Sequence, residues 1–181
     1  MNVAIVIPVF NQLPHTRKCI ESLRASEGRN AGLIVIDNGS SDGTGGYLDE
    51  NAGITTVRNP RNAGVAKAWN QGVRLARTEW IVLMNNDIVV PAGWLDGLLS
   101  FAGEMRYDIV TPAIREGDLD YDLASSASGY MQRMKNVYRE GVADGACFMV
   151  RRGVLDAVGP FDESFRFGQF EDADFFLRAR L

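Results

Sequence analysis

Hydrophobic positions in the first half of the chain form short apolar runs separated by amphipathic stretches. The apolar runs predict strands at residues 3–7, 32–36, 54–57 and 80–84. Apolar residues at helical spacing predict helices in the intervals, at residues 15–25, 44–48 and 65–76. Strand and helix thus alternate four times, which predicts an α/β fold with a mostly parallel central sheet and helices on both faces.

The run Trp80–Met84 consists of five apolar residues in a row, rich in aliphatic side chains. Such a run predicts a strand buried on both faces, at the centre of a parallel sheet. It ends at Asn85, Asn86 and Asp87. Asp87 has neutral amides as neighbours, so it can stay ionised and bind a hard divalent cation. Asn and Asp also favour turns, and a plain strand-ending turn is the alternative.

The second half of the chain has a less regular pattern. Pro91 is expected to open a helix through Phe101, since proline suits a first helical turn. Residues 115–140 are polar and weakly periodic, so we expect a long, functional excursion with a short helix or strands. Further strands are predicted at residues 108–114 and 146–150, and further helices at residues 154–158 and 171–181. Pro8 is expected to end the first strand. No linker interrupts the pattern, so we expect one domain over residues 1–181.

Composition and charge exclude some classes of function. The chain of 181 residues is 46% hydrophobic and 23% charged, which is ordinary for a globular protein. Its formal net charge of −4 and the lack of a basic stripe argue against a nucleic-acid partner. No apolar run suits a signal peptide or a membrane span, so we expect a cytoplasmic protein with at most peripheral membrane association. Cys19 and Cys147 are expected to be small buried hydrophobes.

Side chains with oxygen ligands gather at three predicted strand or helix ends. These clusters are Asp37-Asn38, Asn86-Asp87 and Glu171-Asp172. Each has a structural explanation, respectively a turn, the end of a strand, and a charge pair at a helix start. Because the carboxyl ends of parallel strands meet in one crevice, we expect the clusters to surround a common site.

Seven sequence blocks, in order along nearly the whole chain, resemble family 2 glycosyltransferases. They are IPVFN from Ile7, VIDNGSSDGT from Val35, NAGVAKAWN from Asn62, LMNND from Leu83, GACFMVRR from Gly145, GPFDESF from Gly159 and EDADF from Glu171. The blocks are most similar to the rhamnosyltransferase-like branch. The resemblance implies the GT-A fold, one nucleotide-binding α/β domain, which agrees with the alternation of strands and helices.

The resemblance implies a donor site for a nucleotide-diphosphate sugar, UDP- or dTDP-linked. Pro8 and Asn11 would line the nucleotide pocket, and Asp37 and Asn38 would contact the base and ribose. Asn38 stands where many members have an aspartate, and its carbonyl can still accept from a pyrimidine N3–H. Three further contacts are implied in the block that closes over the donor, Asn62, Gly64 and Asn70.

The same resemblance implies the catalytic groups. Asn85, Asn86 and Asp87 occupy the place of the family's Asp-X-Asp motif. Asp87 would bind Mg²⁺ or Mn²⁺ on the donor diphosphate and so stabilise the leaving group, with the two asparagines contacting the donor. Asp172 would be the general base for an acceptor hydroxyl, with inversion at the anomeric carbon, and Glu171 would support it. Two more contacts to the donor sugar are implied, Asp144 and Gly145.

We therefore expect an inverting sugar transfer from a nucleotide-diphosphate donor to a hydroxyl of a saccharide, lipid-linked or other acceptor, as in cell-wall or polysaccharide biosynthesis. A non-catalytic or partner-dependent sugar-nucleotide-binding domain is one alternative. A sugar nucleotidyltransferase is another alternative. Such enzymes usually have a glycine-rich activation loop after the first strand, and the segment that starts at Pro8 does not resemble one. Family members usually continue past the acidic pair, whereas Leu181 is nine residues after Asp172. We expect either a truncated chain or a minimal enzyme in which another chain supplies one wall of the acceptor site. The oligomeric state is left open.

Overall fold

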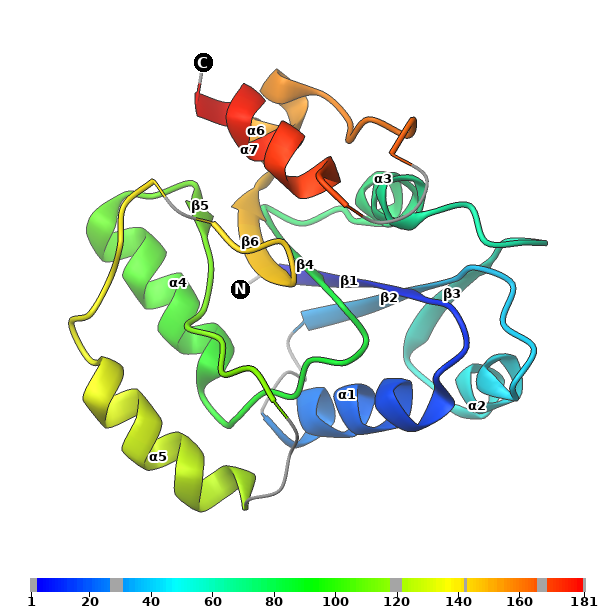
Figure 1. Ribbon diagram of the computed structural model, residues 1–181, viewed down its shortest axis with the longest axis horizontal. Helices are drawn as coiled ribbons and strands as arrows, with labels where there is room; N and C mark the ends of the chain where they lie inside the picture. Colours follow the sequence, from blue (N-terminus) through cyan, green and yellow to red (C-terminus); the bar gives the residue numbers. More distant parts are fainter. Residues whose placement is uncertain (1–2, 27–30, 118–121, 142, 166–168, 181) are drawn as a thin grey trace.

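Six strands form one sheet in the order β3-β2-β1-β4-β6-β5 in the computed structural model, which describes residues 3–26, 31–117, 122–141, 143–165 and 169–180 (Figure 1). The strands are β1 (Val3–Val9), β2 (Ala31–Asp37), β3 (Ile54–Arg58), β4 (Trp80–Met84), β5 (Ile109–Val110) and β6 (Cys147–Arg151). The helices are α1 (Leu13–Ala25), α2 (Thr44–Glu50), α3 (Val65–Leu75), α4 (Trp94–Met105), α5 (Leu123–Met134), α6 (Arg152–Val158) and α7 (Glu171–Arg180).

The strand directions confirm the mostly parallel α/β architecture predicted from the sequence. β3, β2, β1 and β4 run parallel, whereas β6 is antiparallel to β4 and β5 is antiparallel to β6. Because β6 is antiparallel, its first residue Cys147 pairs with Met84, the last residue of β4. The edge that holds the carboxyl ends of the parallel strands therefore also holds the start of β6.

Helices cover both faces of the sheet, and each face has its own apolar core (Figure 1). The core under α1, α2 and α4 contains Ile5 and Ile7, and the core under α3, α6 and α7 contains the intervening Val6. All five residues of Trp80–Met84 are buried, as the sequence predicted. No helix in the described part of the chain has the length and apolar character that crossing a membrane requires.

Helix α3 approaches the sheet closely at Gly72. A Cβ atom at this position would lie 2.1 Å from Cγ1 of Val6 in β1. Gly72 is buried, and so is its α3 neighbour Trp69, at 1% exposure. The missing side chain at Gly72 therefore sets how deeply α3 lies on β1.

Pro8 does not end the first strand, and this prediction was wrong. β1 continues to Val9 and pairs with β2 along its whole length. The backbone N–H of Asn38 donates to the carbonyl of Val9 at 2.8 Å, so the polar groups of Pro8 face the opposite neighbour, β4. Pairing with β4 already ends at Val6. The N–H that proline lacks therefore costs the sheet no hydrogen bond.

The second half of the chain differs from the prediction at three places. Pro91 lies outside α4, which starts at Trp94 after Gly93 adopts a φ of 75°. The strand expected at residues 108–114 shrinks to the two residues of β5 that pair with β6. The excursion at residues 115–140 contains a helix of 12 residues, α5, and none of these residues is buried. The apolar positions Leu123, Ala127, Tyr130 and Met134 nevertheless fall at helical spacing, so the full length of this helix was predictable from the sequence.

Gly72→Ala is expected to lower the free energy of unfolding by about 1–3 kcal/mol, because the new methyl group overpacks the contact with Val6. Urea denaturation followed by circular dichroism measures the change. Gly46→Ala in α2 is the matched control, since a Cβ there meets nothing within 4 Å. The control should be neutral or stabilise by up to about 1 kcal/mol. Equal effects of the two substitutions would contradict the assigned contact.

Candidate active site

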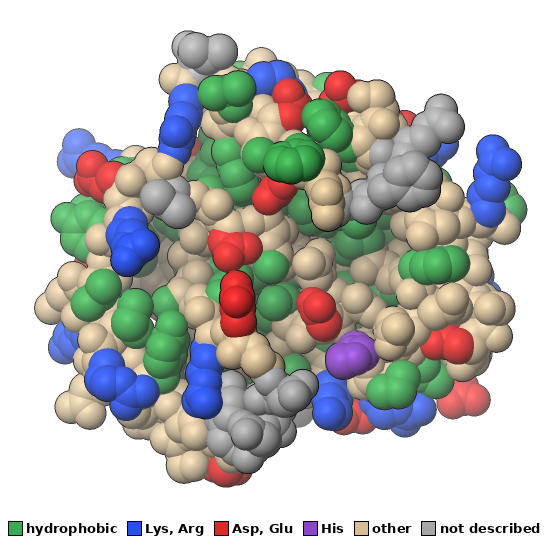
Figure 2. Space-filling model, in the orientation of Figure 1, with side chains coloured by type: hydrophobic (Ala, Val, Ile, Leu, Met, Phe, Trp, Pro, Cys, Tyr) green, Lys and Arg blue, Asp and Glu red, His purple; other side chains and the backbone are tan. Residues whose placement is uncertain are grey.

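Polar residues from several elements meet at the edge of the sheet where the parallel strands end. The N–H of Asn38 after β2 donates to the carbonyl of Val9 in β1 at 2.8 Å. The N–H of Asn85 after β4 donates to the carbonyl of Ala146 before β6 at 2.9 Å. Figure 2 shows acidic side chains near the middle of the viewed face, in the region where Figure 1 draws the start of β6. Residues far apart in sequence thus share one edge, as predicted.

Asp37, the last residue of β2, is a buried carboxylate with a fixed orientation. Only 2% of the residue is exposed. Its Oδ1 atom accepts a hydrogen bond from the N–H of Ser40 at 2.8 Å, and its Oδ2 atom lies 3.9 Å from Nε of Arg58. The bond to Ser40 is the local turn bond that the alternative interpretation expected. The predicted contact with a nucleotide base stays a prediction.

Asn38 belongs to a network of side-chain amides. Its Oδ1 accepts from Nδ2 of Asn59 at 2.8 Å, and its Nδ2 donates to the carbonyl of Gly64 at 3.3 Å. Asn59 in turn exchanges two hydrogen bonds of 2.9 Å with the amide of Gln71 on α3. An amide oxygen has two lone pairs, so Asn38 retains one for a ligand. The network fixes α3 and the end of β3 to the end of β2.

Asn11 joins the loop after β1 to the loop after β2. Its N–H donates to Oγ of Ser40 at 2.8 Å, and its Oδ1 accepts from the N–H of Ser41 at 2.8 Å. The side chain of Asn11 thus binds the backbone of another loop, and its predicted place in the nucleotide pocket stays a prediction. Pro8, the other residue predicted at the nucleotide pocket, is buried within β1.

The loop before α3 is shaped by Asn62 and Gly64. The Oδ1 atom of Asn62 accepts from the N–H of Gly64 at 3.0 Å. Gly64 has a φ of 87° and caps α3, whose Ala68 N–H donates to its carbonyl at 3.2 Å. A residue with a Cβ would be strained at this φ. Gly64 thus holds the loop against Asn38 at the β2 end of the edge.

The residues that follow β4 are held by α1. The Nδ2 group of Asn86 donates to Oγ1 of the fully buried Thr16 at 2.9 Å. The thiol of Cys19 makes a weak hydrogen bond of 3.9 Å to the carbonyl of Asn85. Asp87, the next residue, is exposed. The two asparagines therefore have partners within the protein, while the carboxylate of Asp87 faces solvent.

The thiols of Cys19 and Cys147 are buried, as expected. Burial and, to a smaller extent, the neighbouring Asp87 carboxylate together raise the pKa of Cys19 to about 12. Burial also raises the pKa of Cys147 strongly. Both thiols are therefore protonated at neutral pH and do not act as nucleophiles.

Asp87 offers a hard oxygen donor for a divalent cation. Among the described residues, no group of three His, Cys, Asp or Glu side chains is arranged to hold a metal ion by itself. Mg²⁺ commonly binds one or two carboxylates and completes its shell with water and substrate phosphates. The side chains present therefore fit a cation held jointly by Asp87 and a diphosphate.

Asp172, in the first turn of α7, lies directly on Gly145. A Cβ atom at Gly145 would be 1.9 Å from Oδ2 of Asp172 and 2.4 Å from its Cγ. Asp144 is exposed beside them, and its Oδ1 accepts from the N–H of Ala146 at 2.8 Å. The sequence singled out all three site residues but not this contact, which requires α7 to fold back over the start of β6.

Asn70 of α3 holds the segment that leads to α7. Its Nδ2 donates to the carbonyl of Phe161 at 2.9 Å and to Oε1 of Glu163 at 3.0 Å. Its Oδ1 accepts from the N–H of Phe161 at 2.9 Å. Asn70 is only 4% exposed. These contacts give it a positioning role that the sequence did not suggest, while the predicted donor contact stays a prediction.

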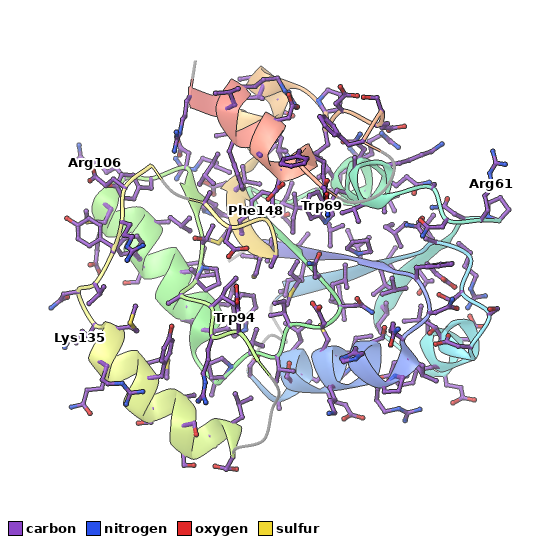
Figure 3. All side chains as sticks on the ribbon, in the orientation of Figure 1. Arg61, Trp69, Trp94, Arg106, Lys135 and Phe148 are labelled. Atoms are coloured by element: carbon purple, nitrogen blue, oxygen red, sulfur yellow. The ribbon has the colours of Figure 1, made fainter. Side chains whose placement is uncertain are left out.

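Aromatic packing fixes α7 against the sheet. The ring of Phe175 lies 4.5 Å from that of Phe161 and 6.4 Å from that of Phe148, between centroids. Trp69 meets Phe148 at 5.7 Å in an edge-on arrangement, and Figure 3 shows these two side chains close to α7. The acidic start of α7 therefore has a defined place at the edge of the sheet.

A family comparison decides what kind of protein has this edge. The model of the family described as Glycosyl transferase family 2 matches residues 4–159. The chain belongs to glycosyl transferase family 2. The resemblance inferred from the seven sequence blocks is thereby confirmed, while the rhamnosyltransferase-like branch stays a prediction.

Curated relatives of this family 2 chain are longer than the chain itself. The Pre-mycofactocin glycosyltransferase of Mycobacterium tuberculosis (strain CDC 1551 / Oshkosh) is 28% identical over 96% of the chain and 38% of that relative. The Undecaprenyl-phosphate 4-deoxy-4-formamido-L-arabinose transferase of Klebsiella pneumoniae (strain 342) is 28% identical over 86% of the chain and 50% of that relative. The chain thus spans half or less of the length of these two relatives.

Solved structures share the fold of this family 2 chain. TarS 1-349 of S. aureus, in complex with UDP, has a TM-score of 0.77 at 17% identity, covering 99% of this chain and 55% of that one. The mannosyltransferase PcManGT of Pyrobaculum calidifontis, in complex with GDP-Man and Mn²⁺, has a TM-score of 0.71 at 18% identity, covering 90% and 48%. These neighbours confirm the predicted GT-A fold.

Several residues that build the site of this family 2 chain were not singled out from the sequence. They are Thr16, Ser40, Asn59, Gln71 and Glu163. Asn59 and Gln71 lie close in sequence to the predicted Asn62 and Asn70, and their amides were a usable signal. Thr16 had no such signal, because its importance comes only from its burial against Asn86.

Glu171 precedes Asp172 in the family 2 chain and is a buried acid. It is 6% exposed, and its Oε2 atom has no hydrogen-bond partner among the described residues. Burial raises the pKa of the Glu171 carboxyl, and the neighbouring Asp172 raises it further, against a lowering by a backbone hydrogen bond. The folded protein therefore holds the Glu171 proton to higher pH than the unfolded chain does.

Glu171→Gln is expected to stabilise the protein more at pH 7 than at pH 4. The unfolded carboxyl titrates near pH 4.3, at about the usual glutamate value, and the folded one at higher pH. Because the folded state binds more protons, the wild type loses stability as the pH rises between the two values, and the glutamine variant does not. Melting temperatures at both pH values measure the difference. Glu50→Gln, at an exposed position of α2, controls for the loss of one charge. An equal gain at both pH values would contradict the raised pKa.

Proposed function

We propose that the chain, residues 1–181, is the donor-binding and catalytic domain of an inverting glycosyltransferase that uses a UDP- or dTDP-linked sugar. The observation that carries the proposal is the contact of Asp172 with Gly145. It gives the edge of the sheet a carboxylate beyond Asp87, on the far side from Asp37. Along the edge, Asp37 would then face the nucleoside, Asp87 the diphosphate and Asp172 the sugar, which is the order of these groups in the donor.

The strand order supports a donor bound along the edge. From β2 to β6 the edge crosses β1 and β4, which is three strand spacings or about 14 Å. An extended nucleoside diphosphate sugar has a comparable length. We assign the base and ribose to Asp37 and Asn38, the diphosphate to Asp87, and the sugar to Asp144 and Gly145.

The loops at the β2 end would form the nucleotide pocket. Asn11 fixes the loop after β1, and Asn62 and Gly64 fix the loop before α3. A pyrimidine N3–H would use the second lone pair of Asn38 Oδ1. The neighbour TarS, solved with UDP, supports a uridine donor.

Asp87 would hold Mg²⁺ or Mn²⁺ together with the donor diphosphate. When bound, the cation supplies Lewis-acid stabilisation of the leaving nucleoside diphosphate. Asn85 and Asn86 hold the Asp87 loop against α1 through Cys19 and Thr16, so the carboxylate is directed outward. The neighbour PcManGT, solved with GDP-Man and Mn²⁺, supports a cation in this kind of fold.

Asp172 would take the proton from the acceptor hydroxyl. The acceptor oxygen then bonds to the anomeric carbon from one face while the bond to the diphosphate breaks on the other, which inverts the carbon. An acceptor hydroxyl is a poor nucleophile without such a base. Gly145 lets the carboxylate approach the sugar, and Glu171 supports its position from the first residue of α7.

The acceptor and the cellular setting are also proposals. The relative from Klebsiella pneumoniae, named as an undecaprenyl-phosphate transferase, supports a lipid-linked acceptor in cell-wall or polysaccharide biosynthesis. We propose a cytoplasmic location with at most peripheral membrane contact. The lengths of the relatives favour one alternative, a sugar-nucleotide-binding domain that needs a partner or further chain for activity. Release of nucleoside diphosphate by this chain alone, with and without acceptor, separates the two.

Asp172→Asn is expected to leave nucleotide and Mn²⁺ binding unchanged while sugar transfer falls by roughly a hundredfold or more. Asparagine keeps the shape and the hydrogen-bonding capacity of the side chain but cannot take the proton. Transfer to an acceptor at saturating donor measures the loss, and Asp174→Asn on the same helix is the control. Full transfer activity in Asp172→Asn would remove this residue from the mechanism.

Asp87→Asn is expected to abolish the Mn²⁺-dependent rise in melting temperature that UDP or dTDP produces, because ligands that bind only the folded state stabilise it. The melting temperature without ligands should stay unchanged, since Asp87 is exposed. Asp96→Asn, at an exposed position of α4, is the matched control. If Asp87→Asn keeps the full Mn²⁺ effect, the metal assignment is wrong.

A further inference from the structure

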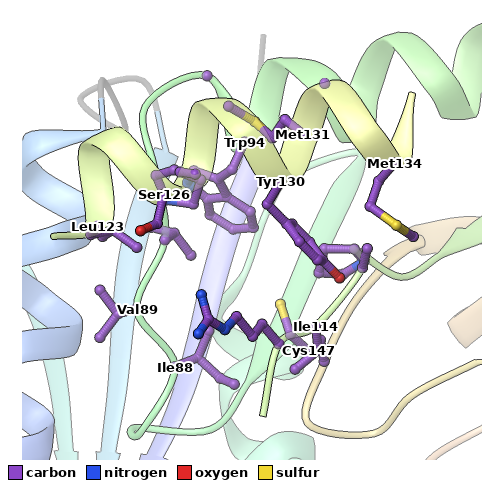
Figure 4. A pocket seen from close by; sticks show the side chains of 18 of the residues that line it. Ile88, Val89, Trp94, Ile114, Leu123, Ser126, Tyr130, Met131, Met134 and Cys147 are labelled. Atoms are coloured by element: carbon purple, nitrogen blue, oxygen red, sulfur yellow. The ribbon is translucent and has the colours of Figure 1, made fainter. Parts of the chain in front are cut away.

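A pocket lies next to the catalytic edge, between the segment that follows β4 and the helices α4 and α5. Its volume is about 360 Å³. In Figure 4 the side chains of Trp94 and Tyr130 point into it from the helices, with Ile88 and Cys147 on the opposite side. Of the residues given a role above, only Asp87 is among those that line it.

The lining of the pocket is mainly aliphatic, aromatic and sulfur-containing, with Asp87, Arg115 and Ser126 as its charged and polar members. It includes Ile88, Leu98, Ile114, Leu123, Met131 and Met134. A saccharide would need a wall rich in hydrogen-bonding groups, because burying its hydroxyls unpaired is costly. An aliphatic chain needs only apolar contact, and methionine side chains adapt readily to its shape.

α5 lies over the pocket without burying any of its own residues. Protein interiors normally leave few voids larger than a water molecule. Here Leu123, Tyr130 and Met134 of α5 face a space instead of a packed core. The pocket therefore has the character of a binding site for an apolar group that completes the packing under α5.

The pocket is continuous with the catalytic edge. Asp87, the proposed cation ligand, lines it, and so does Cys147, two residues after Gly145. Asp37 and the amide network lie toward the other end of the edge, at β2, with β1 between β2 and β4. A donor on the β2 side and an occupant of the pocket would thus approach the reacting carbon from opposite directions.

We propose that this pocket binds the aliphatic chain of the acceptor and directs its hydroxyl end toward Asp87 and Asp172. The proposal rests on the proposed function and deepens it, because it selects an acceptor with an apolar chain over a free saccharide. Apolar contact in the pocket supplies affinity, while the polar edge orients the reacting group.

Binding of 1-butanol, 1-hexanol and 1-octanol, followed by protein NMR, tests the pocket with a hydroxyl on a chain of increasing length. Each methylene that is buried should tighten binding by about fourfold. An affinity that does not rise from butanol to hexanol would overturn the proposal.

Gly97→Leu fills the pocket from α4, because Gly97 lines it and a Cβ there meets nothing within 4 Å. Leucine also favours the helix more than glycine does, so the variant should fold. Gly103→Leu is the matched control, in the same helix, with the same open space at Cβ, and outside the pocket lining. Gly97→Leu should weaken 1-hexanol binding at least tenfold and Gly103→Leu should leave it unchanged. Equal binding by both variants would overturn the proposal.

Paramagnetic relaxation by Mn²⁺ in the presence of UDP tests the direction of the chain. The protons next to the hydroxyl of 1-hexanol should relax faster than those of its terminal methyl group, because Asp87 lies at the hydroxyl end. The opposite gradient would overturn the proposal. The thermal shift with UDP and Mn²⁺, measured without alkanol, tests the proposed function separately. A failure of the donor site is therefore distinguishable from a failure of the pocket.

Discussion

Burial of β4 on both faces is the constraint on which the rest of the structure depends. Every residue of Trp80–Met84 is inaccessible or nearly so. A strand of this kind cannot lie at a sheet margin, so β1 must flank it on one side and β6 on the other. The polar residues that follow have no place in either core. These residues therefore lie at the edge of the sheet, where Asp87 is exposed to solvent and Asn85 and Asn86 form hydrogen bonds with α1.

The antiparallel direction of β6 brings the second half of the chain to the same edge. A parallel β6 would start at the opposite edge, and Gly145 would lie far from the end of β4. With β6 reversed, α7 can pack on the sheet through Phe175 and still present its first turn to Gly145. Burying one such aromatic side chain contributes about 1.5–3 kcal/mol. The position of Asp172 is therefore maintained by apolar packing as well as by polar contacts.

Much of the fold could be predicted from local sequence, because the buried strands are apolar runs and most helices have an apolar stripe. α5 was predicted only as a short helix or strands, although Leu123, Ala127, Tyr130 and Met134 fall at helical spacing; this helix buries no residue and lies over a pocket. β1 can continue through Pro8 because its pairing with β4 ends at Val6. The sequence of β1 alone does not show where that pairing ends. The predicted site residues Asp37, Asp87, Asp144 and Asp172 lie along one edge of the sheet, as expected, and their roles stay predictions. Their detailed arrangement could not be predicted, because it follows from the strand order and from contacts between residues distant in sequence.

Asn70 shows the same dependence on distant contacts. It lies 91 positions from Phe161, and yet its amide pairs with both the N–H and the carbonyl of that residue. Through Gln71, its neighbour in α3, the same helix binds the amide network at the end of β2. The two ends of the edge are thus attached to one rigid helix. A displacement of α3 would shift the residues after β2 and the segment before α7 together, so the distance between Asn38 and the start of α7 should vary less than either varies relative to the rest of the molecule.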